Sequence, residues 1–145
     1  MTTDSRTQRH LSRLIDANLN RLKEGLRVLE DTRRYLYDDK HSSRRFKRLR
    51  HSLQKAYDPS RLQYRDIQND VLKQSTESEM RRKDLQDIVI ANFSRCQESA
   101  RVLEEVYKLL DPSLSSLFKE VRYELYDLEK LLLGTNEAKS NSNSR

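Results

Sequence analysis

The sequence carries one polar signature twice, and this internal repeat constrains the fold more than any other feature. The first copy spans residues 17–31 and the second spans residues 91–105. In both copies Asn, Arg, Glu, Arg and Glu follow one another at every third position, while neighbouring residues change. Lys23 is replaced by Gln97, and Gly25 by Ser99. The repeat therefore preserves particular polar groups and not merely a polar surface, which makes it the main indication of function.

Apolar residues recur at helical intervals in four segments, two in each half of the chain. Only two Gly and two Pro residues are present, so few tight turns are available. Helices are expected at about 12–37, from Ser42 or Ser43 to 57, at about 83–110, and from Ser113 or Ser115 to 133, with Ser12 and these serines as N-caps. This pattern predicts an all-α fold, an antiparallel helical bundle of two duplicated helical hairpins with pseudo-two-fold symmetry.

A chain of 145 residues is long enough for one hydrophobic core but not for two. We expect a single helical domain at 12–133, with repeat one at 12–58, a linker at 59–82 and repeat two at 83–133. Residues 1–11 and 134–145 lack periodic apolar positions and are expected to be disordered tails. The polar linker is long for a small domain, which favours a functional role for it.

The net charge of +6 is concentrated in one segment, residues 33–65, which contains eleven Lys or Arg and three Asp. Such a block could bind nucleic acid, an anionic membrane or a phosphorylated small molecule, and charge alone does not choose among them. The single cysteine, Cys96, shares an apolar stripe with Leu103 and is interpreted as a small core residue. No apolar run is long enough to span a membrane, so a cytoplasmic protein without a membrane partner is expected.

The repeated Arg and Glu residues allow two interpretations. On a helix they form an alternating ladder, which could be no more than a series of salt bridges. A ladder requires only charge, however, whereas both copies use Arg and Glu at every position, and Arg suits bidentate recognition of phosphate or carboxylate. The candidate catalytic residues are accordingly Arg21, Glu24, Arg27, Glu30, Arg95, Glu98, Arg101 and Glu104.

Two further polar groups extend the signature. Asn18 and Asn92 lie at the edge of the apolar stripe, where each could either bond a neighbouring helix or present its amide to a ligand ring. No Glu-x-x-His pattern occurs, which disfavours a di-iron site, and Mg²⁺ held by one or two carboxylates plus ligand phosphates fits better. No glycine-rich phosphate loop is present either, so a nucleotide would have to be held by side chains and helix N-termini.

With these residues the chain closely resembles the small hydroxymethylpyrimidine-phosphate kinase family of thiamine biosynthesis, which occurs alone or fused to thiamine-phosphate synthase. The resemblance covers about residues 12–133, and this chain would be a standalone form. Leu72 stands where the family pattern has glycine. The residues on which the resemblance rests are Asp16 to Asp31, Ala91 to Glu105, Arg65, Asp66, Asp70 and Val71 of the linker, and Lys119, Arg122 and Tyr123.

The resemblance implies an enzyme that uses ATP and Mg²⁺ to phosphorylate 4-amino-5-hydroxymethyl-2-methylpyrimidine phosphate to the diphosphate. A phosphorylated pyrimidine is the implied small-molecule partner, thiamine-phosphate synthase is a candidate protein partner, and self-association is left open. Glu24, Glu98 and Asp70 are the candidate ligands of Mg²⁺. The candidate substrate- or nucleotide-binding residues are Asn18, Asn92, Lys47, Arg50, Arg65, Asp66, Lys119, Arg122 and Tyr123.

The rival interpretation is a non-catalytic basic bundle that binds RNA or a partner protein such as the synthase. Tyrosines at positions 35, 37, 57 and 64 interleave with the basic block, as stacking platforms for bases would. A nucleic-acid binder, however, has no use for a carboxylate beside every arginine, because carboxylates repel the phosphate backbone. The kinase interpretation is therefore preferred.

Overall fold

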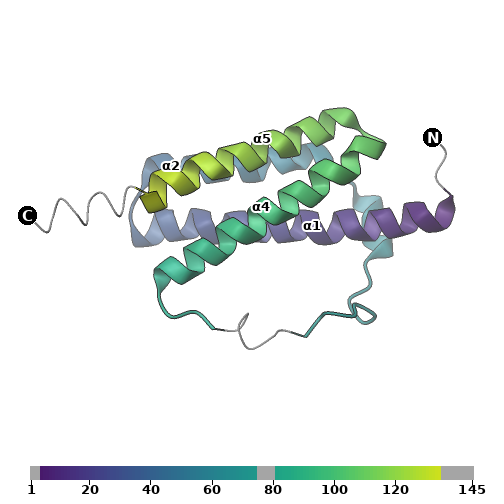
Figure 1. The fold of residues 1–145 in the computed structure, drawn as a ribbon, viewed down its shortest axis with the longest axis horizontal. Helices are drawn as coiled ribbons and strands as arrows, with labels where there is room; N and C mark the ends of the chain where they lie inside the picture. The colour runs from purple at the N-terminus through teal and green to yellow at the C-terminus, as the bar shows by residue number, and fades with distance from the viewer. Residues whose placement is uncertain (1–3, 75–80, 135–145) are drawn as a thin grey trace, which may run out of the picture.

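The computed structural model describes residues 4–74 and 81–134, which form helices joined by short connections and one long linker (Figure 1). The four main helices are α1 (Ser5–Asp31), α2 (Lys40–Ser52), α4 (Leu85–Leu110) and α5 (Pro112–Glu129). No strand occurs within these residues, which confirms the all-α prediction. In the same part of the chain, no helix has both the length and the apolar character needed to cross a bilayer.

Short irregular helices extend or connect the main ones. A π-helical turn, η1 (Thr32–Leu36), continues α1, and a second, η4 (Lys130–Gly134), continues α5. Two 3₁₀ turns, η2 (Leu53–Ala56) and η3 (Pro59–Tyr64), follow α2. The described parts of the linker, residues 65–74 after η3 and 81–84 before α4, lie outside the helices (Figure 1).

Each main helix begins at an aspartate and not at a predicted serine. Asp4 accepts a hydrogen bond from the Thr7 N–H, so residues 5–11 are helical and the predicted start at residue 12 and tail over 1–11 were wrong there. The other three N-caps are Asp39, Asp84 and Asp111. Aspartate competes well with serine because its carboxylate also favours the positive helix N-terminus. The predicted tail over 135–145 lies outside the described residues.

The helices pack in a chain of neighbours, with α1 against both α2 and α4, and α4 against α5. Figure 1 shows α4 crossing α1, with α2 and α5 on the side of them away from the linker. Three phenylalanines without exposed surface, Phe46, Phe93 and Phe118, occupy the interior. Phe46 contacts Phe93 at 5.8 Å between ring centroids, and Phe118 stacks on Tyr107 at 5.6 Å. One core therefore joins both halves of the chain.

Helices α1 and α4 approach each other closely at Gly25. A Cβ atom built on Gly25 would lie 2.5 Å from the Cys96 Sγ and 3.6 Å from the Asn92 carbonyl oxygen. Cys96 itself is buried, and its thiol lies 3.7 Å from the Leu22 carbonyl oxygen as a weak donor. The prediction that Cys96 is a small core residue is confirmed, and it explains why position 25 is a glycine where the second copy has serine.

Gly25→Ala is therefore expected to destabilise the fold, although alanine is the better helix former. Overpacking of a tight core costs about 1–3 kcal/mol, against a helix-propensity gain of about 1 kcal/mol. In a Cys96→Ala background the added methyl group finds space, and the same substitution should become neutral or stabilising. Urea unfolding of the four variants measures this coupling. Gly134→Ala is the matched control, because its added Cβ meets only the Lys130 Cγ at 4.0 Å.

The same burial makes the Cys96 thiol unreactive. Burial raises the pKa of Cys96 to about 12, despite the nearby charge of Arg95. Because the thiolate is the nucleophile, a thiol reagent at pH 8 should modify the native chain at least about a hundredfold more slowly than the urea-unfolded chain. Rapid labelling without unfolding would show that α1 and α4 separate readily at their crossing.

Candidate active site

A cleft of about 570 Å³ lies between α1, α4 and the linker. It is lined by the first three residues of the first Asn-Arg-Glu-Arg-Glu signature, by the second and third residues of the second signature, and by linker residues. Its polar lining consists of Asn18, Asn20, Arg21 and Glu24 of α1, Arg95, Glu98 and Ser99 of α4, and Asp70 and Lys73 of the linker. The two signatures therefore meet in one cleft, which the linker borders.

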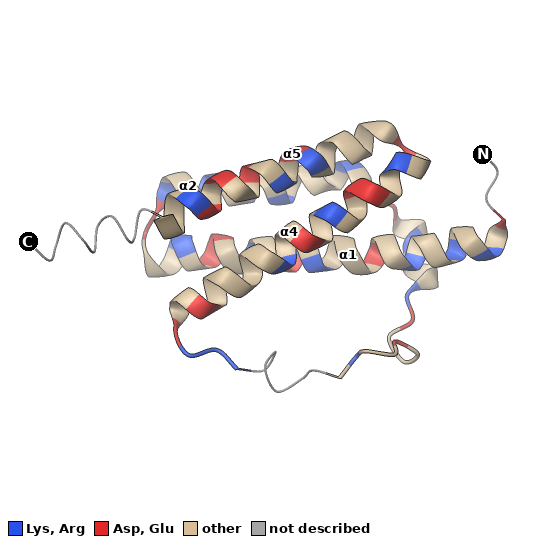
Figure 2. Cartoon of the chain, in the orientation of Figure 1, with Lys and Arg blue, Asp and Glu red and all other residues tan. Residues whose placement is uncertain are grey.

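The charged groups at the centre of the cleft are not paired with one another. Within the described part of the chain, no ion pair involves Arg21, Glu24, Arg95 or Glu98. Arg21 makes only a long contact, 3.5 Å from its Nη1 to the Asn18 Oδ1. Alternating charges along α1 and α4 are visible where the two helices cross (Figure 2). Two guanidinium groups are thus available to an anionic ligand.

The outer positions of the signature behave differently, as a salt-bridge ladder. Arg101 lies 3.3 Å from Glu104 and 3.0 Å from Glu105, and Arg27 pairs more loosely with Glu30 and Asp31. None of these residues lines the cleft. The salt-bridge interpretation of the ladder thus describes the outer positions, whereas the inner ones, Arg21, Glu24, Arg95 and Glu98, form no ion pair with the described residues.

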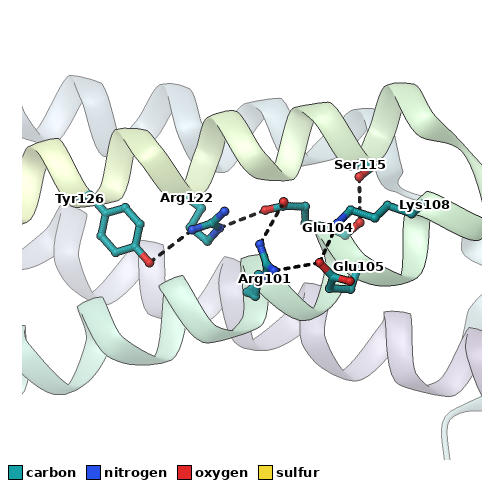
Figure 3. Close-up of polar contacts among 7 residues, drawn as sticks. All are labelled: Arg101, Glu104, Glu105, Lys108, Ser115, Arg122 and Tyr126. Atoms are coloured by element: carbon teal, nitrogen blue, oxygen red, sulfur yellow. Dashed lines mark hydrogen bonds and ion pairs between the residues drawn. The ribbon is translucent and has the colours of Figure 1, made fainter.

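Glu30 and Glu104 are buried and each binds an arginine of the following helix. The Arg50 Nε lies 2.9 Å from the Glu30 Oε1, and the Arg122 Nε lies 3.0 Å from the Glu104 Oε1. Figure 3 shows the second of these pairs, with Arg122 between Glu104 and Tyr126. The hydrogen bond that Arg122 donates to the Glu104 carboxylate raises the pKa of Arg122 above its ordinary value. These four residues, all predicted site residues, connect helices within each half.

The two asparagines satisfy their amides within their own helices. The Asn18 Nδ2 donates to the Leu14 carbonyl oxygen at 2.9 Å, and the Asn92 Nδ2 donates to the Ile88 carbonyl oxygen at 2.8 Å. Asn18 borders the cleft, whereas Asn92 does not and lies instead beside Gly25. The cleft is consequently asymmetric, although the signatures that form it are alike.

A second hollow of about 370 Å³ adjoins the cleft and is formed by α1 and the linker. The two hollows share four lining residues, which are Ala17, Asn20, Arg21 and Asp70. Arg65 and Asp66, both predicted site residues, line only the second hollow. Arg65 is fixed there by two hydrogen bonds of 2.8 Å to Asp16 of α1, which anchor the linker.

The linker turn next to the cleft closes without the glycine of the family pattern. The Asp70 carboxylate accepts a hydrogen bond from the Leu72 N–H at 3.0 Å. Among the described non-glycine residues, only Asp38 has a positive φ, so Leu72 needs no left-handed conformation. The Leu72 side chain is 85% exposed and borders the cleft. Leucine is therefore compatible with this turn.

The structure also adds residues that the sequence analysis missed. Lys73 follows Asp70 on the same turn, and Ser99 replaces the glycine of the first copy at the α1–α4 crossing. His10 and Arg13 line the second hollow, in the part of α1 that was expected to be a tail or its edge. Lys73 could have been predicted from the sequence, because it stands two residues after the Arg65–Val71 pattern.

The remaining predicted residues lie outside both hollows. Lys47 borders a different hollow beside α2, while Lys119 lies over the ring of Tyr123, 5.9 Å from its centroid, on the exposed surface of α5. The three predicted Mg²⁺ ligands, Glu24, Glu98 and Asp70, do line the cleft together. Within residues 4–74 and 81–134, however, no three His, Cys, Asp or Glu side chains are close enough to form a ready-made metal site.

Comparison with known proteins places the chain in a family. A thiamine-phosphate synthase of Synechocystis sp. is 39% identical over 126 residues, which cover 86% of this chain and 37% of that protein. A thiamine-phosphate synthase of Nostoc punctiforme is 37% identical over 128 residues, which cover 88% of this chain and 36% of that protein. This chain thus spans little more than a third of these relatives, and no solved structure matches it significantly. The model of the ThiD2 family matches residues 13–131, and the chain belongs to this family.

Proposed function

We propose that this chain acts in thiamine biosynthesis and transfers the γ-phosphoryl group of ATP to 4-amino-5-hydroxymethyl-2-methylpyrimidine phosphate. The observation that carries the proposal is the cleft, which is lined by Arg21 and Arg95, neither of which has a carboxylate partner among the described residues. Membership of the ThiD2 family and the relatives named thiamine-phosphate synthase support the pathway. The resemblance to hydroxymethylpyrimidine-phosphate kinases supports the reaction.

The residues of the cleft suit phosphoryl transfer to a phosphate. An oxygen of the acceptor phosphate is already an anionic nucleophile, so no buried general base is required. It forms a bond to the γ-phosphorus while the bond from that phosphorus to the bridging oxygen of ADP breaks. Arg21, Arg95 and Lys73 would neutralise the charge that gathers on the transferred group and hold both ligands in line.

The two adjoining hollows match a reaction between two ligands. Arg21 and Asp70 line both of them, so a phosphate in either hollow would lie beside the same guanidinium group. We assign the transferred phosphoryl group to this junction. The bidentate bond between Arg65 and Asp16 would hold the linker, and with it Asp70 and Lys73, against the junction.

Mg²⁺ fits this cleft only as an ion shared with the ligands. Asp70, Glu24 and Glu98 would supply one or two carboxylate ligands, with ligand phosphate oxygens and water completing the shell. When bound, the ion would neutralise charge on the nucleotide phosphates. The carboxylates would also orient Arg21 and Arg95 once a ligand is present.

The rival RNA-binding interpretation receives less support. Four arginines of the basic block, Arg33, Arg45, Arg50 and Arg65, are bound to carboxylates and are not presented to a polyanion. Tyr35 and Tyr37 are exposed but lie beside Arg34 and Arg33 in cation–π contacts. We therefore retain a small phosphorylated ligand as the proposed partner.

Incubation of the purified chain with Mg-ATP and the pyrimidine monophosphate, followed by anion-exchange chromatography, tests the proposal. The pyrimidine diphosphate and ADP should form in equal amounts. The free alcohol should be a poor substrate, because without its phosphate the cleft arginines remain unpaired. Absence of turnover with the monophosphate would contradict the kinase proposal, and comparable rates with the alcohol would contradict the role given to the arginines.

A further inference from the structure

A hollow of about 300 Å³ lies at the corner between α1, η1 and α2, and shares no lining residue with the two hollows described above. Four cationic side chains line it, together with two acidic ones and Ser43. The cationic residues are Arg34, Lys40, Arg44 and Lys47, and the acidic ones are Glu30 and Asp38.

The positive charge in this hollow is only partly offset by the residues that the structure describes. Within the described part of the chain, Lys40, Arg44 and Lys47 take part in no ion pair, and Arg34 contacts only the Tyr35 ring. The Glu30 carboxylate is taken up by Arg50, through bonds of 2.9 and 3.4 Å. Asp38 is thus the only acidic residue of the hollow that lacks such a bond among the described residues.

The N-terminus of α2 adds to this potential. Asp39 caps the helix through the Ser42 N–H at 3.0 Å, but its carboxylate is also bound by Arg33 at 2.8 and 3.1 Å. The first turn of α2 contains no acidic residue beyond this cap, which itself offsets part of the positive end of the helix. The attraction for an anion at this corner therefore comes mainly from the cationic side chains, with a smaller contribution from the helix end.

The second half of the chain shows that the fold does not need these cations. It forms the same type of corner between α4 and α5, with Ser115 and Lys119 in place of Ser43 and Lys47. At the positions of Lys40 and Arg44, however, it has Pro112 and Ser116. At the position of Arg34 it has Lys108, which is paired with Glu105 at 2.7 Å. Because clustered like charges destabilise a fold unless an anion binds them, the four cations of the first corner require a reason other than folding.

We propose that this corner, the α2 anion site, binds a phosphate or diphosphate group at a location separate from the cleft. The ligand class follows from the charge: four cations that form no ion pair with any described residue surround a space large enough for a diphosphate, and Asp38 offsets part of their charge. The inference does not depend on the proposed kinase activity, because the site is defined by its own residues and by binding alone.

The test is an NMR titration of the ¹⁵N-labelled full chain with inorganic pyrophosphate at constant ionic strength, set with sodium chloride. Saturable shifts are expected at the amides of residues 40–47. Lys40→Gln combined with Arg44→Gln should weaken these shifts at least tenfold, whereas Asp38→Asn should tighten binding because it removes the opposing charge. Arg48→Gln is the matched control: it neutralises an exposed cation of α2 that does not line the hollow.

Binding in the cleft is separated from binding at the corner by an Arg21→Gln variant, which should retain the shifts at residues 40–47. A parallel titration with ADP shows whether nucleotide phosphates or only inorganic anions occupy the corner; either result supports the site. Shifts confined to residues around Arg21 and Arg95, or unchanged shifts in the Lys40→Gln/Arg44→Gln variant with its fold intact by circular dichroism, would overturn the proposal.

Discussion

Replacing Arg21 or Arg95 by alanine is expected to lower kcat for phosphoryl transfer by about a hundredfold to a thousandfold. A preorganised donor that faces the charge developing in a transition state contributes about this much. Both side chains line the cleft, one from each copy of the signature, and neither is in an ion pair with a described residue. Single-turnover rates with Mg-ATP and the pyrimidine monophosphate measure the effect. The variants should fold normally, because Arg21 and Arg95 are exposed.

The matched controls are Arg27→Ala and Arg101→Ala, at the next arginine of each copy. These arginines are about half exposed, are bound to carboxylates of their own helices and do not line the cleft. Their removal is expected to change kcat less than about fivefold, since each exposed pair contributes only about 0.2–1 kcal/mol. Equal losses in all four variants would mean that the whole ladder binds ligands. Unchanged activity in Arg21→Ala and Arg95→Ala would remove the cleft as the active site.

The helical fold and most helix ends could be predicted from the sequence, because apolar periodicity and prolines are strong local signals of where helices run and end. The third helix was expected at about 83–110 and is found at Leu85–Leu110. The starts of α1, α2 and α5 were harder to predict, since serine and aspartate both cap well and stand close together at these three starts. Pro112 begins α5 directly after the cap at Asp111, a position where its missing N–H costs nothing.

The candidate site was predicted in part, for a physical reason. Residues spaced three apart point in successively different directions around a helix, because a full turn takes about 3.6 residues. The members of one signature therefore cannot all face one ligand. Arg21 and Glu24 face the cleft, whereas Glu30 faces the interior and binds Arg50. Which residues of the signature face the cleft depends on how α1 packs against α4, and that packing is a tertiary contact, with Gly25 of α1 close to Cys96 of α4.

Replacing Glu104 by alanine is expected to lower the free energy of unfolding by about 3–5 kcal/mol. Its side chain is 5% exposed and binds Arg122, which is 13% exposed. Removing one partner of such a buried pair leaves the other charge without compensation. The Glu104 backbone also anchors the start of α5, where the Ser115 hydroxyl donates to its carbonyl oxygen at 2.8 Å (Figure 3), but that bond does not involve the side chain.

Urea unfolding of Glu104→Ala, Arg122→Ala and a Glu104→Leu/Arg122→Met double variant tests this account. The double variant should be more stable than either single one, because it leaves no charge unpaired in the interior. Glu105→Ala, at the neighbouring and half-exposed carboxylate that pairs with Arg101 and Lys108, should lose at most about 1 kcal/mol. If Glu104→Ala were no worse than Glu105→Ala, the pair would not hold α4 against α5. Because Glu30 is bound by Arg50 in the same way, Glu30→Ala should show a loss of similar size, and a much smaller one would mean that the two halves are stabilised differently.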